Sequence, residues 1–416
     1  MAKEDFKVQS PKMIIVVGAG PAGLLLALML SRQAIPVTVL EAAEQLDTRP
    51  RATHYGSPAV YELRRAGVLP DVLAEGFTPG VICWRKLYGT YLAGIDNRIM
   101  ANDPDQVACL PLGRLGQILL DHLARQPSAE IKWNHRVTGL GQDPDQAWVT
   151  VATPTGEVTM QATYIVGCDG ANSQIRRSLF GDGVFPGKTW DEQIVATNVY
   201  YDFHQFGYED ANFIIHPEHW YMASRITKDG LWRVSYGEKG GLTHEQLAER
   251  QPKKFQAMLP GHPTPDQYRL VNFSPYRVHQ RLAEKMRVGR FLLAADAAHL
   301  CNPFGGLGLT GGIADVGGLY DCLYGLYTGR ATPDILDMYD RVRREKYLEV
   351  IDKLSSDNLR RMFETDPDTV IESGSDELFN LCLKAEKDVE LAKQLVTGIN
   401  VIKYDFTQHY SEAGKI

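Results

Sequence analysis

The sequence predicts an α/β protein in which a nucleotide-binding sheet domain is interrupted by a mainly antiparallel β-sheet domain and followed by a C-terminal helical segment. Three observations support this prediction: a glycine-rich turn between an apolar strand and a helix near the N-terminus, a central stretch of aromatic strands, and an apolar strand that returns after it. At 416 residues with 44% hydrophobic content, the chain is too long for one small core. We therefore expect at least two folding units.

The first motif is IIVVGAGPAGLLLALMLSRQAIPVTVLE, which begins at Ile14 and ends at Glu41. Its glycines Gly18, Gly20 and Gly23 follow a buried-type strand and open a helix, with the GxGxxG spacing of a Rossmann-like dinucleotide-binding unit. The first glycine permits the tight turn, the second lets a pyrophosphate approach the main chain, and the third lets the helix pack on the sheet. Glu41 ends the second strand, where a carboxylate can accept both ribose hydroxyls of an adenosine. The motif predicts dinucleotide binding but does not separate NAD from FAD.

Composition argues against several other kinds of function. Net charge is −7 with no basic block, so neither nucleic acid nor an anionic membrane has electrostatic support as a partner. The six cysteines lie far apart, without a CxxC pair or a His/Cys cluster of metal-ligand spacing, so we predict reduced thiols and no metal site. Residues 13–30 carry no charge, but glycine and proline interrupt them, which favours strand, turn and helix over a membrane span. Because the polar start does not resemble a signal peptide, we predict a cytoplasmic protein.

The remaining sequence divides by its periodicity. Residues 131–170 alternate as a small meander that ends in an apolar strand before Asp169, and residues 288–295 return to such a strand. Between them lie aromatic strands broken by KDG and EKGG turns, and then a polar helical stretch. The predicted domains are the nucleotide-binding domain at 1–185 and 285–345, the substrate-binding sheet domain at 186–284, and the C-terminal helical segment at 346–416.

Three blocks in a fixed order carry a resemblance to a known family. They are GAGPAG at 18–23 with Glu41, CDGANSQIRR at 168–177, and AADAAHLCNPFGGLGLTGG at 294–312. Together they resemble the group A (class A) flavoprotein monooxygenases, the single-component aromatic hydroxylases of the para-hydroxybenzoate hydroxylase type. The resemblance implies FAD as cofactor, NADPH or NADH as co-substrate, and O₂. It implies that a hydroperoxide at flavin carbon C4a delivers one oxygen to an electron-rich aromatic substrate, carboxylated or of natural-product type.

The same resemblance assigns residues to the cofactor. The expected contacts run along FAD: Gly18, Gly20, Gly23 and Glu41 at the adenosine diphosphate half, Asp169 serving FAD and the nicotinamide nucleotide, Asp296 at the ribityl chain, Arg51 and Arg114 at the flavin side, Pro303 beside the ring, and the helix after Gly308, including Leu309, at the pyrimidine edge. The N–H groups at a helix start would stabilise negative charge there. One departure is Ala295, which replaces the family's usual glycine before the ribityl-contacting acid.

The motifs identify substrate-binding residues less specifically than cofactor-binding residues. Arg225 matches by position the family arginine that grips a substrate carboxylate, with an edge-strand arginine paired to Asp229 or solvent as the alternative, and Arg233 competes for the role. Tyr236 is a candidate for assisting phenol ionisation, although packing in a sheet is the more common task of such a tyrosine. His54, which closely follows Arg51, could face the flavin or the substrate, with a surface histidine as the alternative.

Other functions stay open. An FAD-dependent dehydrogenase or reductase of the same fold is the main alternative, and an NAD-only dehydrogenase or a flavin-dependent sensor are weaker ones. None of the six tryptophans forms the WxW of flavin-dependent halogenases. The helical segment at 346–416 is expected to close the fold or to form a homodimer contact.

Overall fold

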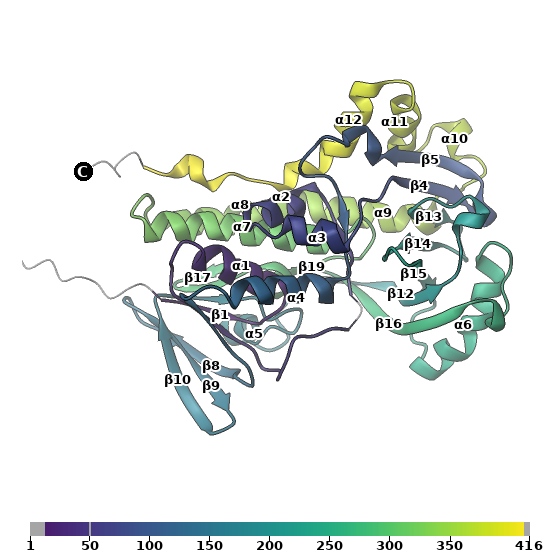
Figure 1. The fold of residues 1–416 in the computed structure, drawn as a ribbon. Coiled ribbons are helices and arrows are strands. Elements are labelled where there is room, and N and C mark those ends of the chain that lie inside the picture. Colours follow the sequence, from purple (N-terminus) through teal and green to yellow (C-terminus); the bar gives the residue numbers. More distant parts are fainter. Residues whose placement is uncertain (1–12, 50, 412–416) are drawn as a thin grey trace, which may run out of the picture.

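The computed structural model describes residues 13–49 and 51–411. Figure 1 shows two large sheets at opposite sides of the molecule, with the long helices α7 (Leu307–Tyr327) and α8 (Asp334–Lys346) lying over the first of them. The chain then continues into α9 (Lys353–Glu364), which packs on the second sheet, so one C-terminal stretch supports both sheets.

The first sheet has six strands in the order β17-β18-β11-β1-β2-β7, all parallel except for β17 at the edge. Its strands are β1 (Ile14–Val17), β2 (Val37–Leu40), β7 (Ala129–Lys132), β11 (Tyr164–Gly167), β17 (Arg287–Val288) and β18 (Phe291–Leu293). Strands buried on both faces read as continuous apolar runs, which is why IIVV, VTVL and FLL build this sheet. The prediction that residues 288–295 complete the nucleotide-binding sheet is confirmed, because β18 pairs with β11.

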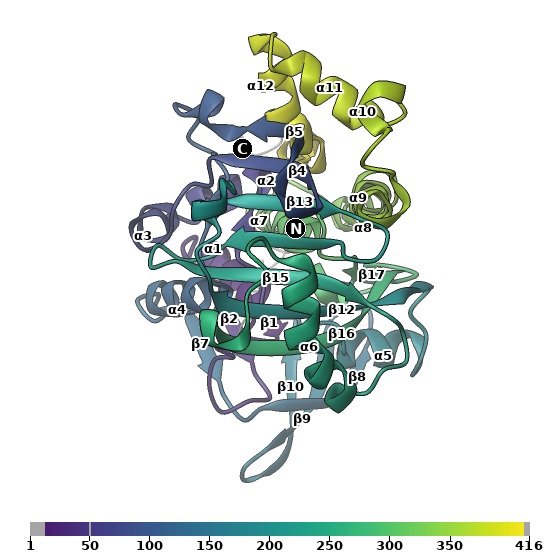
Figure 2. The same cartoon turned by 90° about the vertical axis from the view of Figure 1, so that its right-hand side faces the viewer.

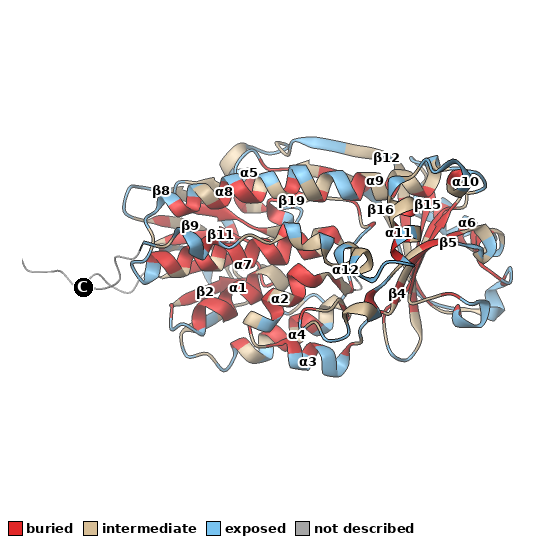
Figure 3. Cartoon of the chain, turned by 90° about the horizontal axis from the view of Figure 1, so that it is seen from above, coloured by how far each residue is buried: buried red, intermediate tan, exposed pale blue. Residues whose placement is uncertain are grey.

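Several helices pack around this first sheet. They are α1 (Pro21–Ser31), α2 (Ser57–Arg65), α3 (Leu69–Glu75), α4 (Leu112–Leu123) and α5 (Gln174–Phe180). Helix α7 packs against α1, α2 and α8, so it is buried along most of its length (Figure 3). A small meander of β8 (Arg136–Gln142), β9 (Ala147–Thr153) and β10 (Gly156–Ala162) projects from the sheet, as the alternation of residues 131–170 predicts.

The second sheet has eight strands in the order β19-β16-β12-β15-β14-β13-β4-β5. They are β4 (Val81–Lys86), β5 (Tyr91–Asp96), β12 (Gly187–Tyr200), β13 (Ala211–Ile215), β14 (Tyr221–Arg225), β15 (Leu231–Glu238), β16 (Arg269–Leu282) and β19 (His299–Leu300). All neighbouring pairs are antiparallel except β13 with β4. The domain boundaries stay a prediction, but the sheet takes strands from outside residues 186–284, because β4 and β5 extend one edge and β19 the other.

The two faces of this sheet have different partners. On the outer face, Tyr221, Trp232 and Tyr236 pack under helix α6 (His244–Met258), which crosses the sheet in Figure 2. On the inner face, Trp84 and Phe213 form a cluster with Phe304 and helix α9 (Lys353–Glu364). Because side chains alternate along a strand, a residue one position away from an outer-face residue points to the inner face.

The C-terminal segment is helical, as predicted. After α9 it continues through α10 (Val370–Ser373), α11 (Glu377–Ala385) and α12 (Val389–Thr397), and α11 and α12 contact β5. A two-stranded ribbon of β3 (His54–Tyr55) and β6 (Ala108–Cys109) links the two large sheets. Among the described residues, no helix is long and apolar enough to cross a membrane.

Candidate functional site

The GxGxxG turn is shaped by close contacts at two of its three glycines. Gly18 has φ +105°, and a Cβ there would lie 2.5 Å from the carbonyl oxygen of Cys168 at the end of β11. A Cβ on Gly23 would collide with the carbonyl oxygen of Gly18. At Gly20, in contrast, a Cβ would meet nothing within 4 Å. Two glycines are thus required by the fold, whereas the one at the start of α1 leaves its main chain open to a ligand.

Glu41 lies where β2 ends, beside this turn. Its Oε2 accepts from the N–H of Ala19 over 2.7 Å and its Oε1 from the N–H of Ala43 over 2.8 Å. A carboxylate has about four acceptor positions, so these two bonds leave capacity for ligand hydroxyls. The hydrogen bond to Ala19 fixes the carboxylate next to the glycines, as the sequence motif predicts.

The second and third motifs are tied together by one buried arginine. Asp169 accepts from Ser173 Oγ over 2.5 Å and from the N–H groups of Gln174 and Ile175, so it caps the start of α5. Burial raises the pKa of Asp169, although these hydrogen bonds oppose the shift. Arg176, on the same helix, donates to the carbonyl oxygens of Ala171 over 2.8 Å and of Ala297 over 3.0 Å. The loop after Asp169 is therefore held against the loop that contains residue 296.

Asp296 follows a strained backbone position. Ala295 has φ +56°, in the left-handed region that favours glycine. Its N–H donates to Asp315 Oδ2 over 3.1 Å, and Gly312 makes room for its methyl group, because a Cβ there would lie 2.7 Å from Ala295 Cβ. The Asp296 side chain keeps more than a third of its surface accessible, while the surrounding protein raises its pKa by burial. The Asp296 side chain is thus accessible to a ligand although much of the protein surrounds it.

Ala295→Gly is expected to stabilise the protein by about 1 kcal/mol, because the left-handed conformation costs a residue with a Cβ roughly 1–2 kcal/mol and the extra chain entropy of glycine offsets part of the gain. The free energy of unfolding from denaturant titration measures the change. Ala34→Gly, at φ +59° in a surface turn, is the matched control and should shift in the same direction. A loss of stability in Ala295→Gly alone would show that the methyl group contributes packing that exceeds the strain.

The glycine-rich run leads into helix α7. The helix begins at Leu307, two residues earlier than the sequence prediction, so Gly308 and Leu309 lie in its first turn. Their N–H groups have no acceptor within the helix, so they can donate to a ligand. Gly311 and Gly312 admit Ile351 and the methyl of residue 295, respectively. The first part of the run can thus face a ligand, whereas the second part packs against protein.

A set of polar groups on the inner face lies near this helix start. The carbonyl oxygen of His54 lies 3.8 Å from where a Cβ would stand on Gly306. His54 Nε2 is buried and has no hydrogen-bond partner among the described residues, while Nδ1 is 2.9 Å from Thr53 Oγ1. Arg233 donates from Nε to Asn198 Oδ1 over 3.1 Å and from a terminal nitrogen to the carbonyl oxygen of Arg51. This set contains two candidates that the sequence analysis named only as alternatives.

The two leading substrate candidates lie elsewhere on the sheet. Tyr236 is fully buried on the outer face, where its ring packs edge-on against Phe255 of α6 at 5.9 Å. Arg225 is paired in register with Trp232, donates to the carbonyl oxygen of Thr227 over 3.1 Å, and lies 3.5 Å from Asp210. These contacts are structural, and the catalytic roles assigned to both residues stay predictions that the geometry does not favour.

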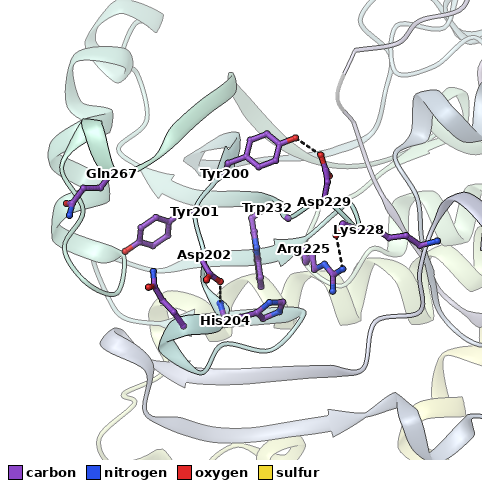
Figure 4. Close-up of a pocket in the computed structure, with 11 residues that line it drawn as sticks. Tyr200, Tyr201, Asp202, His204, Arg225, Lys228, Asp229, Trp232 and Gln267 are labelled. Carbon is purple, nitrogen blue, oxygen red and sulfur yellow. Dashed lines mark hydrogen bonds between the residues drawn. The ribbon is translucent and has the colours of Figure 1, made fainter.

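Arg225 also lines an open hollow of about 660 Å³, shown in Figure 4. Its wall is polar and aromatic, and its residues are Tyr200, Tyr201, Asp202, His204, Gln205, Arg225, Lys228, Asp229, Gly230, Trp232 and Gln267. Because Trp232 belongs to the outer-face cluster, this hollow lies on the side of the sheet away from Phe304 and the start of α7. Asp296 does not line this hollow.

Comparison with known proteins agrees with this geometry. A family model described as an FAD binding domain matches residues 12–353. The para-nitrophenol 4-monooxygenase of Pseudomonas sp. (strain WBC-3) is 40% identical over 85% of this chain and 88% of its own length. The 6-hydroxy-3-succinoylpyridine 3-monooxygenase HspB of Pseudomonas putida (strain DSM 28022 / S16) is 35% identical over 91% and 94%. The crystal structure of p-nitrophenol 4-monooxygenase PnpA from Pseudomonas putida DLL-E4 matches with a TM-score of 0.87 and 36% identity, covering 94% of this chain and 98% of that one.

The chain belongs to the class A flavoprotein monooxygenases. It is an FAD-dependent oxidoreductase of the aromatic hydroxylase type, and oxygen insertion is favoured over the dehydrogenase alternative because the relatives are monooxygenases. The open main chain at Gly20, the spare acceptors of Glu41 and the accessible carboxylate of Asp296 together fit the three parts of FAD that the sequence motifs predict. Their individual contacts stay predictions.

In this flavoprotein monooxygenase, two further cofactor candidates are held by surface partners. Arg51 pairs with Asp47 over 2.9 Å and is about half exposed, although its charge acts on Asp296. Arg114 forms a bidentate pair with Glu75 at 2.8 and 3.0 Å and is also exposed. A contact from Arg114 to FAD would require this pair to open, so the structure supports Arg51 more than Arg114.

One buried carboxylate, Asp315, connects the loop at residue 295 to helices α7 and α8 and was not among the predicted site residues. Asp315 is fully buried on α7 and accepts from His299 Nε2 and Arg343 Nε, each over 2.6 Å, in addition to the N–H of Ala295. Burial opposes its ionisation, but the charges of His299 and Arg343 lower its pKa below the usual range. The sequence alone does not reveal this role, because Asp315 is surrounded in the chain by small and apolar helix residues. Its contact with His299 forms only in the folded structure.

Proposed function

We propose that this monooxygenase inserts one oxygen atom of O₂ into the ring of a phenol that carries no carboxylate, with NAD(P)H as the reductant. The observation that carries this proposal is the composition of the inner face near α7, which offers one guanidinium, that of Arg233, beside the uncharged imidazole of His54. One cation suits one developing negative charge. A carboxylated phenol would bring two.

The relatives support the need for a ring hydroxyl in the substrate. Their printed names describe action on para-nitrophenol and on a hydroxylated pyridine, so each of the two aromatic rings carries a hydroxyl group. A phenolate is more electron-rich than its phenol, and an electron-rich ring is attacked more readily by an electrophilic oxygen. Residues that favour the phenolate would therefore accelerate the transfer.

The protein's contribution is binding and electrostatics. FAD supplies the redox chemistry when bound, since it accepts a hydride from NAD(P)H and delivers oxygen to the ring. The first-turn N–H groups of Gly308 and Leu309 stabilise negative charge at the start of α7. The aromatic cluster of Trp84, Phe213 and Phe304 keeps water from the inner face.

A substrate comparison tests the proposal. Purified protein with FAD should consume NAD(P)H and O₂ much faster with p-nitrophenol than with 4-nitroanisole, in which a methyl group blocks the hydroxyl. It should also prefer p-nitrophenol to 4-hydroxybenzoate. Turnover under ¹⁸O₂ should place one labelled oxygen atom on the ring, and attack at the carbon that bears the nitro group should release nitrite. Equal rates with the phenol and its methyl ether would contradict the need for the hydroxyl, and a preference for the benzoate would restore Arg225 as the candidate carboxylate ligand.

We include two further features in the proposal. The protein is cytoplasmic, which the six unpaired cysteines support, and it forms a homodimer that sedimentation can test. The choice between NADH and NADPH is to be read from the two initial rates.

A further inference from the structure

Resting on the proposed function, we propose that His54 and Arg233 are catalytic residues that convert the bound substrate from phenol to phenolate. His54 Nε2 takes the hydroxyl proton, and Arg233 holds the oxygen anion that forms. This assigns a role to two residues on the inner face, in place of the outer-face tyrosine and arginine that sequence position favours.

The His54 ring is held in a fixed orientation that suits a general base. The ring is fixed by β3, which pairs with β6 at Cys109, and by Thr53 Oγ1 at 2.9 Å from Nδ1. We assign the ring proton to Nδ1, which donates to this hydroxyl and leaves a lone pair on Nε2. Nε2 is buried without a partner among the described residues. A buried polar atom is costly when it stays unpaired, so a ligand hydroxyl there would gain a full hydrogen bond.

Arg233 lies on the same face as the flavin-side groups. It is one residue from Trp232 and from Val234, which both belong to the outer-face cluster, so its side chain points to the inner face. Its guanidinium is half-buried, and burial lowers its pKa. Because the main-chain oxygen of Arg51 and the amide oxygen of Asn198 are its partners, it retains its full positive charge for a ligand anion.

Three inner-face side chains of the sheet keep accessible surface and could contact the substrate ring. Ala196, Met222 and Tyr276 are inner-face residues of β12, β14 and β16 that keep accessible surface, although they lie within an eight-stranded sheet. Outer-face residues of the same strands, such as Val195 and Tyr221, are fully buried. We therefore place the aromatic ring of the substrate against the accessible inner-face surface of these three residues.

The charges around His54 come from several elements. Burial and the charge of Arg233 on β15 lower the pKa of His54 to about 4, and Asp210, before β13, opposes this effect. Asp210 is partly neutralised by Arg225 at 3.5 Å. Burial raises the pKa of the Cys109 thiol and of the Tyr276 hydroxyl, each to about 12, so both groups stay uncharged. His54 is therefore neutral and able to accept a proton at neutral pH.

The proton step is balanced within the site. The substrate O–H bond breaks, its electron pair stays on the oxygen, and the proton forms an N–H bond at His54 Nε2. The resulting imidazolium and phenolate attract each other, and Arg233 adds a second favourable charge to the anion. The low pKa of the free imidazole rises once the phenolate forms beside it, because an opposite charge favours the protonated form.

Binding without turnover tests the assignment. p-Nitrophenol is titrated into the FAD-containing protein without NAD(P)H, and difference spectra separate bound phenolate, which is yellow, from bound phenol. In the unmodified protein the pKa of bound p-nitrophenol should fall at least one unit below its value in water. Arg233→Met should return this pKa to the value in water and weaken phenolate binding 10-fold or more, while Arg233→Lys should restore part of the shift.

A second readout follows the proton itself. In weak buffer one unit below the pKa of free p-nitrophenol, the unmodified protein should bind phenolate without releasing a proton to an indicator dye, because His54 keeps it. His54→Gln should either bind neutral phenol or release one proton per site. Arg277→Met is the matched control, since Arg277 is an exposed arginine next to Tyr276 that points to the outer face, and it should behave as the unmodified protein.

The outcomes separate this inference from the proposed function. If the unmodified protein binds neither form of p-nitrophenol, the proposed substrate class is wrong. If it binds phenolate and both Arg233→Met and His54→Gln leave the bound pKa and the proton release unchanged, then the assignment to these residues is wrong and the substrate class stands. Retention of FAD by each variant verifies that the fold is intact.

Discussion

Asp315→Ala is expected to lower the free energy of unfolding by about 3–5 kcal/mol, because removing one partner of a buried ion pair leaves an uncompensated charge. Arg343 has 1% of its side chain exposed, and Asp315 is its carboxylate partner at 2.6 Å. The same change removes the acceptor of His299 and of the Ala295 N–H. Denaturant unfolding followed by circular dichroism measures the loss, and bound FAD should dissociate earlier in the titration.

The control for this prediction is an exposed pair. Asp357 and Arg360 lie 3.2 Å apart on α9 with nearly half of each side chain accessible, so Asp357→Ala should cost less than about 0.5 kcal/mol. The double variant Asp315→Leu/Arg343→Met should recover much of the loss, because buried ion pairs can be replaced by apolar side chains of similar volume. A loss below about 1 kcal/mol in Asp315→Ala would show that water reaches Arg343.

The motif positions were predictable because each is dictated by local chemistry. The glycines at 18, 20 and 23, the acid at 41 and the strand before Asp169 all follow from main-chain requirements of a turn or from the apolar pattern of a buried strand. The structure places all of them along one edge of the parallel sheet, where the sequence order alone implies that they meet.

The substrate side depends on which face of a strand points inward, and that is a tertiary property. In LWRVSYGE, Arg233 alternates with apolar Trp232 and Val234, so the sequence does show that it faces away from them. It does not show which of the two faces carries the cofactor. Only the packing of Phe304 against Phe213 and of α6 against Tyr236 decides this.

Strands β4 and β5 were missed for a related reason. Their residues 81–96 lie between helices of the nucleotide-binding part, and only β4 makes the long-range parallel pairing with β13 that places them in the second sheet. A pairing between residues more than a hundred positions apart leaves no periodic signal. Asp315 is the same kind of case, since its partners come from the turn before α7 and from α8.

Gly20→Ala is expected to weaken FAD binding 10-fold or more while leaving the free energy of unfolding of the FAD-free protein nearly unchanged. Gly20 has φ −70°, which any residue adopts, and a Cβ there meets no protein atom within 4 Å. The space that the methyl group would fill is the space through which the diphosphate reaches the N–H groups at the start of α1. Quenching of FAD fluorescence by FAD-free protein measures the dissociation constant, and each factor of ten corresponds to about 1.4 kcal/mol.

Alanine variants at two other glycines serve as controls for this prediction. Gly23→Ala places a methyl group against the Gly18 carbonyl oxygen, so it should lower stability with or without FAD. Gly398, which also has open space around its Cβ position but lies near the C-terminus, should tolerate alanine with neither effect. If Gly20→Ala bound FAD as tightly as the unmodified protein, the diphosphate could not approach the main chain at the first turn of α1, and the cofactor would have to lie along a different edge of the sheet.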